Sequence, residues 1–258
     1  MSSLPAERTF VQLSDFKFRL WPILVAAILM EGILRGGRQA AKWTFVNGPP
    51  AWDGHVSIFL MLAIAFQALL GLVGIAVMSR LVPRADSHLR WPPGPTYVGL
   101  AVVIGLGMGL VMLIADYWPA LLTGTPPASS YAETPYNWDT VGYLAGMLAT
   151  GTAEETIFRG LLVGFLSVFV PGRLRIGSVD LPVAGYIIAL LFGLAHWKSF
   201  VVSPFHEALA QQTYAFVWGL TYVWLMERSR SLLAPVIAHG VGNFSEVAMI
   251  LLLVALWS

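Results

Sequence analysis

Charged residues are scarce in this 258-residue chain: Asp, Glu, Lys and Arg make up 11% of it, whereas 57% is hydrophobic. Soluble domains carry roughly 25% charged residues, so this chain has too little charge to cover a water-exposed surface. It needs lipid as its solvent, and we expect an integral membrane protein with membrane lipid as a partner. The net charge of +1, without any long Lys/Arg cluster, argues against nucleic acid as a partner.

Several catalytic and processing signatures are also missing. Cysteine is absent, which excludes disulfides, a thiolate nucleophile and Cys-ligated zinc. A cleavable signal peptide is not expected, because residues 1–19 hold several charges and the first apolar run begins at Leu20. His206 lacks the second histidine of a His-Glu-x-x-His motif, and no Gly-x-Ser-x-Gly elbow is present. Asp116 has no second intramembrane aspartate with which to form an aspartyl dyad.

Long apolar runs are what the chain has in abundance, and a spanning helix needs about 20 mostly apolar residues. The candidate spans are 20–36, 56–79, 96–118, 139–170, 182–198, 208–226 and 231–257. The last run is either one unbroken helix or is split near Gly240 or Gly242, so seven or eight membrane helices are predicted. The predicted fold is an all-α, polytopic transmembrane helix bundle, one domain over 1–258, with a surface loop at 123–139.

Lysine and arginine are distributed unevenly between the predicted connections, which predicts the orientation of the bundle. With the N-terminus in the cytoplasm, the outer side holds only Arg38, Lys42 and Lys198, with Arg35 near a boundary. The inner side then holds Arg8, Lys17, Arg19, Arg80, Arg84, Arg90, Arg173, Arg175, Arg228 and Arg230. We therefore expect a multi-pass protein of a prokaryotic cell membrane with a cytoplasmic N-terminus.

Ionisable groups inside an apolar run cost about 2.5–3.5 kcal/mol each unless they are paired or hydrated, so they mark functional sites. Glu154, Glu155 and Arg159 lie near the middle of the 139–170 run. Glu155 and Arg159 are four residues apart and can pair on one helix face, whereas Glu154 points about 100° away. This leaves Glu154 free to act as a general base. A purely structural ion pair would explain Glu155 and Arg159 but not Glu154.

Two later runs contribute histidines. His196 lies near the end of an apolar run, where Trp197 beside it is typical of a membrane boundary and an interfacial role is an alternative. His239 and Asn243 are four residues apart and share a face if the helix continues. Both can donate hydrogen bonds to a developing oxyanion, although interhelical hydrogen bonding would also explain them.

Taken together, these residues provide a base, an imidazole and two polar donors, which is a hydrolytic set. If they form one site, the ends of Glu154, His196, His239 and Asn243 must converge around a cavity that can hold water. Two other classes of protein stay open. One is a non-enzymatic membrane immunity or scaffold protein that keeps these residues for packing. The other is a proton-coupled transporter that uses them as a relay.

The three motifs, in this order, resemble those of the CPBP/ABI family, which joins CAAX proteases and bacteriocin-processing enzymes and includes the type II CAAX prenyl endopeptidases. That family is recognised by Glu-Glu-x-x-x-Arg, Phe-x-x-x-His and His-x-x-x-Asn or Asp. The resemblance covers roughly residues 139–250. The motif residues here are Glu154, Glu155, Arg159, Phe192, His196, His239 and Asn243.

The resemblance implies an intramembrane endopeptidase that cleaves a membrane-associated protein or peptide. Glu154 with His196 would activate a water molecule, His239 and Asn243 would stabilise the oxyanion, and the Glu-Arg pair would orient the first carboxylate. No cofactor is implied. A zinc-dependent version, with Glu154, His196 and His239 as ligands, is the less favoured alternative. The resemblance fixes neither the substrate nor whether that substrate is prenylated.

Overall fold

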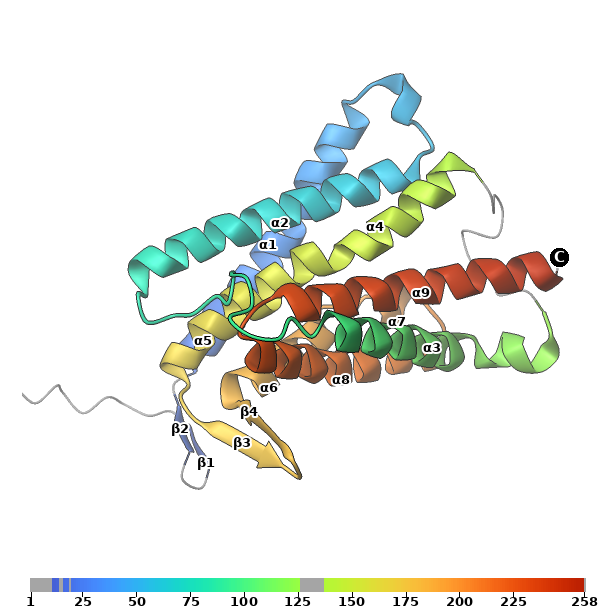
Figure 1. Cartoon of the computed structure of the whole chain (residues 1–258). Coiled ribbons are helices and arrows are strands. Elements are labelled where there is room, and N and C mark those ends of the chain that lie inside the picture. The colour runs from blue at the N-terminus through green and yellow to red at the C-terminus, as the bar shows by residue number, and fades with distance from the viewer. Residues whose placement is uncertain (1–10, 14–15, 19, 126–136, 258) are drawn as a thin grey trace, which may run out of the picture.

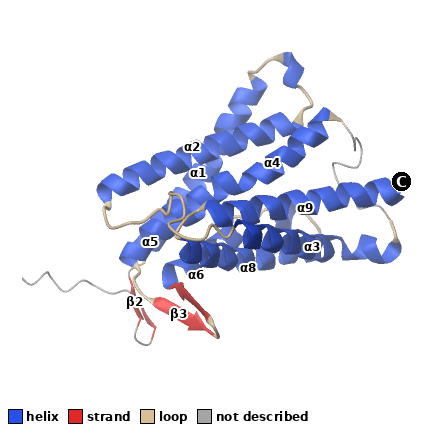
Figure 2. Cartoon of the chain, in the orientation of Figure 1, coloured by secondary structure: helices blue, strands red, loops and turns tan. Residues whose placement is uncertain are grey.

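The computed structural model of the chain describes residues 11–13, 16–18, 20–125 and 137–257. Long helices lie side by side in a bundle, and short β-hairpins lie at one end of it (Figures 1 and 2). The helices are α1 (Trp21–Val46), η1 (Pro50–Trp52), α2 (Val56–Leu81), α3 (Val98–Thr123), α4 (Trp138–Glu155), η2 (Thr156–Val163), α5 (Gly164–Phe169), α6 (Val183–Leu194), α7 (Ser199–Val202), α8 (Phe205–Ser229) and α9 (Leu233–Trp257). The strands are β1 (Val11–Leu13), β2 (Phe16–Phe18), β3 (Arg173–Ile176) and β4 (Val179–Pro182).

Every predicted apolar run coincides with a helix, so the nearly all-α fold is confirmed for the described residues. Four helical segments are long and apolar enough to cross a membrane, and these make the chain an integral membrane protein. They are Val56–Leu81, Val98–Thr123, Val183–Val202 and Leu233–Trp257. The prediction of seven or eight spans is not confirmed, because α1, α4 with η2, and α8 are long but carry more charged or polar residues. Most of the predicted 123–139 loop lies outside the described residues.

The antiparallel hairpins β1–β2 and β3–β4 were not predicted. Each strand is only three or four residues long, which is too short for the alternation of apolar and polar residues to stand out in a sequence. In β3–β4, Gly177 occupies the turn with φ of +62°, a left-handed conformation that glycine adopts readily.

The last helix is continuous, so the alternative of a break near Gly240 or Gly242 is wrong. Gly240 instead lets two backbones approach closely: a Cβ atom added there would collide with the carbonyl oxygen of Leu148 in α4. On another side of α9, a Cβ added at Gly105 of α3 would come within 2.7 Å of the carbonyl oxygen of Ala238. Small residues therefore hold α3 and α4 tightly against α9, as is usual where helices pack in lipid.

The centre of the bundle is occupied by the α4–η2–α5 helix, which runs without a break along the predicted 139–170 region. All eight residues of η2 are buried, and η2 contacts α1, α2, α6 and α8. Its backbone is a π-helix, in which hydrogen bonds span five residues instead of four, and such turns occur often at functional sites. The wide turn begins directly after Glu155 and contains Arg159.

Candidate functional site

Glu155 and Arg159 form the ion pair that their spacing predicts. Arg159 Nη1 lies 3.0 Å from Glu155 Oε1, and both side chains are 0% exposed. Arg159 Nη2 also donates to the carbonyl oxygen of Gly219 in α8 at 3.1 Å. The guanidinium lies 4.6 Å from the ring centre of Phe192 and 4.9 Å from that of Tyr222, so aromatic rings cover the charge. The predicted contact between the two residues is confirmed.

His239 lies between the two glutamates, a link that was not predicted. Its Nδ1 is 2.7 Å from Glu155 Oε1 and its Nε2 is 3.8 Å from Glu154 Oε2. An ionised carboxylate can only accept a hydrogen bond, so Nδ1 carries the proton and donates a hydrogen bond to Glu155. The ring also stacks on Tyr222, with centroids 4.9 Å apart and planes 7° from parallel. Glu155 thus fixes the ring so that Nε2 faces Glu154.

Glu154 is the carboxylate of the pair that remains accessible. Its side chain is 25% exposed, against 0% for Glu155. It borders a cavity of about 190 Å³, large enough for several water molecules. The residues that line the cavity include Glu154, His196, His239 and Asn243, together with aromatic side chains from α8. The four side chains line one cavity, as predicted, whereas their catalytic roles stay predictions.

His196 and Asn243 are each held by one hydrogen bond. His196 lies just past the end of α6, and its Nδ1 is 2.9 Å from the carbonyl oxygen of Phe192. Nδ1 is therefore the protonated nitrogen, which leaves Nε2 able to accept a hydrogen bond in the neutral ring. Asn243 Nδ2 donates to Thr150 Oγ1 at 2.8 Å and has a second proton to offer.

The position of His239 beside the glutamates follows from the close approach of α4 and α9. A Cβ atom added at Gly151 would come within 3.1 Å of the backbone nitrogen of Gly240. With no side chain between them, the two backbones bring Glu154 and Glu155 level with His239. The sequence analysis did not predict this pairing of one glycine from each helix.

Asp116, Tyr214 and Glu246 form a second polar cluster at the cavity, which sequence reasoning missed. The Tyr214 hydroxyl donates to Asp116 Oδ2 at 3.0 Å, and the carboxyl group of Glu246 lies near that of Asp116. The only available signal was the position of Glu246, three residues after Asn243 and therefore on nearly the same face of α9.

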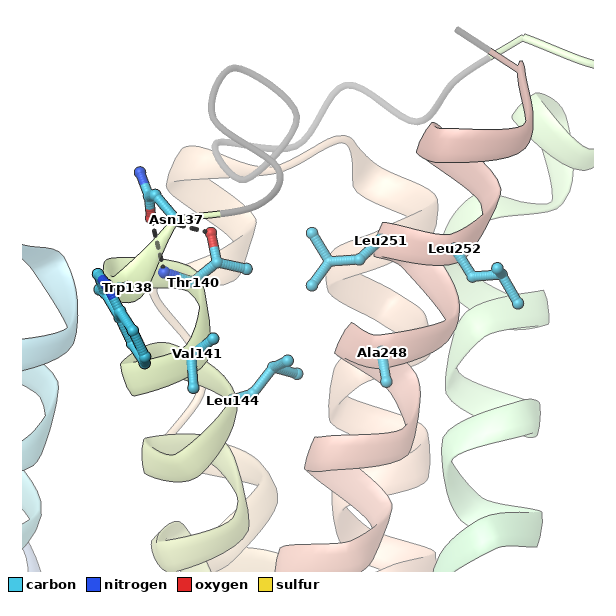
Figure 3. Close-up of a pocket in the computed structure, with 8 residues that line it drawn as sticks. All are labelled: Asn137, Trp138, Thr140, Val141, Leu144, Ala248, Leu251 and Leu252. Atoms are coloured by element: carbon cyan, nitrogen blue, oxygen red, sulfur yellow. Dashed lines mark hydrogen bonds between the residues drawn. The ribbon is translucent and has the colours of Figure 1, made fainter.

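A larger cavity in the described part of the molecule lies away from these residues. It is an apolar groove of about 580 Å³ between the first turns of α4 and the last turns of α9. Figure 3 shows Val141 and Leu144 of α4 facing Leu251 and Ala248 of α9 across it. At 1.5 Å per residue, its edge near residue 137 lies about 25 Å along the helix from Glu154. The groove has no ionisable side chain in its lining.

A metal site was the alternative for Glu154, His196 and His239. Over residues 20–125 and 137–257, no three His, Asp or Glu side chains gather in a way that could hold a metal ion. Of the three candidate ligands, His239 already directs Nδ1 to Glu155, and His196 directs Nδ1 to a backbone carbonyl oxygen. These contacts leave Nε2 of each ring uncommitted, as in zinc-bound histidines, so the expectation that no metal is needed stays a prediction.

The fold and the cavity define a membrane protein with a buried glutamate–histidine centre, and the comparison with protein families identifies its relatives. Residues 136–245 match the family described as type II CAAX prenyl endopeptidase Rce1-like. This segment is similar to a protease family, and the resemblance seen in the three motifs is confirmed. Comparisons with curated proteins and with solved structures gave no match.

Proposed function

We propose that this protein is an intramembrane endopeptidase of the CAAX type, in which Glu154 activates a water molecule that hydrolyses a peptide bond. The observation that carries the proposal is the difference between the two glutamates. Glu155 is fully buried and engaged by Arg159 and His239, whereas Glu154 borders the cavity and keeps a 25% exposed side chain. An unpaired carboxylate facing a water-sized cavity is what a general base requires.

The attacking water is held by Glu154 and His196. The water donates one hydrogen bond to the Glu154 carboxylate and the other to Nε2 of His196, whose Nδ1 is occupied by the Phe192 carbonyl oxygen. Glu154 takes a proton as the water oxygen attacks the carbonyl carbon of the substrate. The 3.8 Å gap between Glu154 Oε2 and His239 Nε2 is too long for a direct hydrogen bond and is bridged by water.

Asn243 and His239 stabilise the oxyanion that forms on the substrate. The second amide proton of Asn243 and the Nε2 of His239 are the donors, the latter when the ring is protonated between the two glutamates. The intermediate collapses when the carbon–nitrogen bond breaks and Glu154 returns its proton to the leaving nitrogen. The carboxylate is thereby regenerated without any metal or cofactor.

The substrate is a membrane-associated protein or peptide, because the reacting groups lie inside a helix bundle poor in charge. The distribution of Lys and Arg supports a cytoplasmic N-terminus. Whether the substrate is prenylated is left open, because no feature of the described residues is specific for a prenyl chain.

Replacement of Glu154 tests the proposal. Three membrane samples are prepared, which contain the parent protein, the Glu154→Gln variant or the Glu31→Gln variant. In each sample we count the new protein termini that cleavage of membrane proteins creates. Glu31 is a matched control, a carboxylate paired with Arg35 on α1 and absent from the cavity lining. We expect Glu154→Gln to lower the cleavage rate by about 10²–10⁴-fold, while the purified variant elutes and melts like the parent protein.

Three other results would each revise the proposal. Substantial cleavage by purified Glu154→Gln would remove this residue as the base. Inhibition by a chelator that zinc reverses would support the metal-dependent alternative. Unchanged membrane termini in all three samples, with unfolding of Glu154→Gln, would indicate that the residue serves packing in an immunity or scaffold protein.

A further inference from the structure

A polar pocket of about 340 Å³ lies at the end of the bundle where α5 and the β3–β4 hairpin are found (Figure 1). It is separate from the glutamate–histidine cavity and shares no lining residue with it. Its wall comes from the α2–α3 connection, α5, the start of β3 and the end of α8. The side chains that matter for its chemistry are Arg84, Asp86, His88, Arg173, Glu227 and Arg230.

Two of its arginines have no partner. Arg173 is engaged by Glu227 at 2.7 Å and Asp180 at 3.2 Å, and the Asp86 carboxylate is paired with Arg90 at 2.5 Å. The guanidinium groups of Arg84 and Arg230, in contrast, meet no carboxylate or carbonyl oxygen among the described residues. With Asp180 and Arg90 included, four arginines face three carboxylates, so one positive charge remains uncompensated.

His88 supplies an independent sign of a ligand. It is only 7% exposed, and its Nδ1 lies 3.3 Å from the carbonyl oxygen of Asp86. Its Nε2 is buried and has no hydrogen-bond partner within the described chain. Buried polar atoms are almost always paired, so an unpaired one at a pocket calls for an explanation. Because Nδ1 already donates to the Asp86 carbonyl oxygen, an acceptor oxygen of a bound group would satisfy Nε2 when the ring carries a proton on both nitrogens.

The backbone holds His88 in this place at a cost. Its φ of +51° lies in the left-handed region, which is unfavourable for a residue with a side chain. The conformation is fixed because the His88 carbonyl oxygen accepts from the backbone nitrogens of Arg90 at 2.9 Å and Leu232 at 3.1 Å. Strain of this kind persists where the surrounding structure enforces it, commonly at binding sites.

We propose that this pocket binds a phosphate group, carried by a phospholipid headgroup or by a soluble phosphate compound, with Arg84, Arg230 and His88 as its donors. Guanidinium groups match the geometry of phosphate oxygens. A phosphodiester carries one negative charge, which offsets positive charge that the arginines and a protonated His88 leave uncompensated in the pocket. The pocket also lies where α2 and α8 end, the level at which the headgroups of a bilayer are found.

Binding is tested on the full-length protein, independently of any proteolysis. The protein is placed in phosphatidylcholine bilayers with and without phosphatidylglycerol, and the lipid retained after extraction is counted by native mass spectrometry. A second arm measures the melting temperature in detergent with increasing inorganic phosphate. The variants are Arg84→Gln/Arg230→Gln, His88→Gln and Arg175→Gln. Arg175 is the matched control, an exposed arginine of β3 outside the pocket lining.

We expect the double variant to bind about ten- to a hundredfold more weakly, because two charge-assisted hydrogen bonds are lost. His88→Gln should weaken binding less, and Arg175→Gln should leave it unchanged. Retention of phosphatidylglycerol identifies a lipid source, and stabilisation by inorganic phosphate identifies a soluble one. If Arg175→Gln and the double variant lose binding equally, the effect comes from general surface charge and the proposal is overturned. The proposal is also overturned if neither phosphatidylglycerol nor inorganic phosphate binds. If the double variant melts early, Arg84→Gln alone is measured instead.

Discussion

Removal of the Arg159 side chain should destabilise the protein more than most single substitutions. Arg159→Met preserves length and apolar contacts but leaves Glu155 with His239 as its one charged or polar partner. It also takes the donor from the carbonyl oxygen of Gly219, which lies 3.1 Å from Arg159 Nη2. Both members of the ion pair are 0% exposed, so water cannot replace the lost contact. Breaking a buried pair in this way costs about 3–5 kcal/mol.

The loss is measured as the melting temperature of the purified protein in detergent, followed by tryptophan fluorescence. At about 2–4 °C per kcal/mol for a chain of this size, the expected decrease is roughly 6–20 °C. Arg80→Met, which removes an exposed arginine at the end of α2, should melt like the parent protein. Adding Glu155→Gln to Arg159→Met should recover part of the loss, because no unpaired charge is then left buried.

A decrease of only 1–2 °C for Arg159→Met would refute the reasoning, since it would mean that the carboxylate finds water or another partner. A double variant that melts below Arg159→Met would also refute it. The ion pair would then not be the reason for the loss.

Other predictions concern the packing and the oxyanion donors. Gly240→Ala should lower the free energy of unfolding by about 1–3 kcal/mol, because the added methyl group meets the Leu148 carbonyl oxygen; Gly107→Ala, at an open position of α3, should be neutral or stabilising. Thr150→Val removes the acceptor that holds Asn243, so we expect kcat to fall by about tenfold with KM nearly unchanged. An equal melting-temperature loss in the two glycine variants, or a change in KM alone for Thr150→Val, would contradict these predictions.

The sequence was sufficient wherever local rules decide the outcome. Apolar runs gave the positions of the long helices, because lipid requires backbone groups to be satisfied within a helix. The spacing of Glu155 and Arg159 predicted their ion pair. Glu154 is a third charged residue that this pair does not explain, so it was predicted to be the catalytic carboxylate. The shared cavity of Glu154, His196, His239 and Asn243 was predicted only by treating unpaired polar groups in separate runs as one set.

Features that depend on contacts between helices were not predictable. The hydrogen bond from His239 to Glu155 depends on the register of α4 against α9, which Gly151 and Gly240 set without any periodic signal. The π-helical turn of η2 arises in an interior segment for which hydropathy alone indicates an ordinary helix. Asp116 was recognised as lacking a second aspartate, but its acidic neighbour is Glu246 of α9.

Insertion of the α4–η2–α5 helix into a bilayer as an isolated segment would expose three charges to lipid, at about 2.5–3.5 kcal/mol each. Helices α2 and α3 are made earlier and are apolar enough to insert alone, and α2 packs against both α4 and η2. They offer a protein surface before the charged helix arrives. Gly219 and His239, the remaining partners of the ion pair, arrive only with α8 and α9. We therefore expect assembly of the bundle in the membrane to follow the order of the chain, with the polar centre completed last.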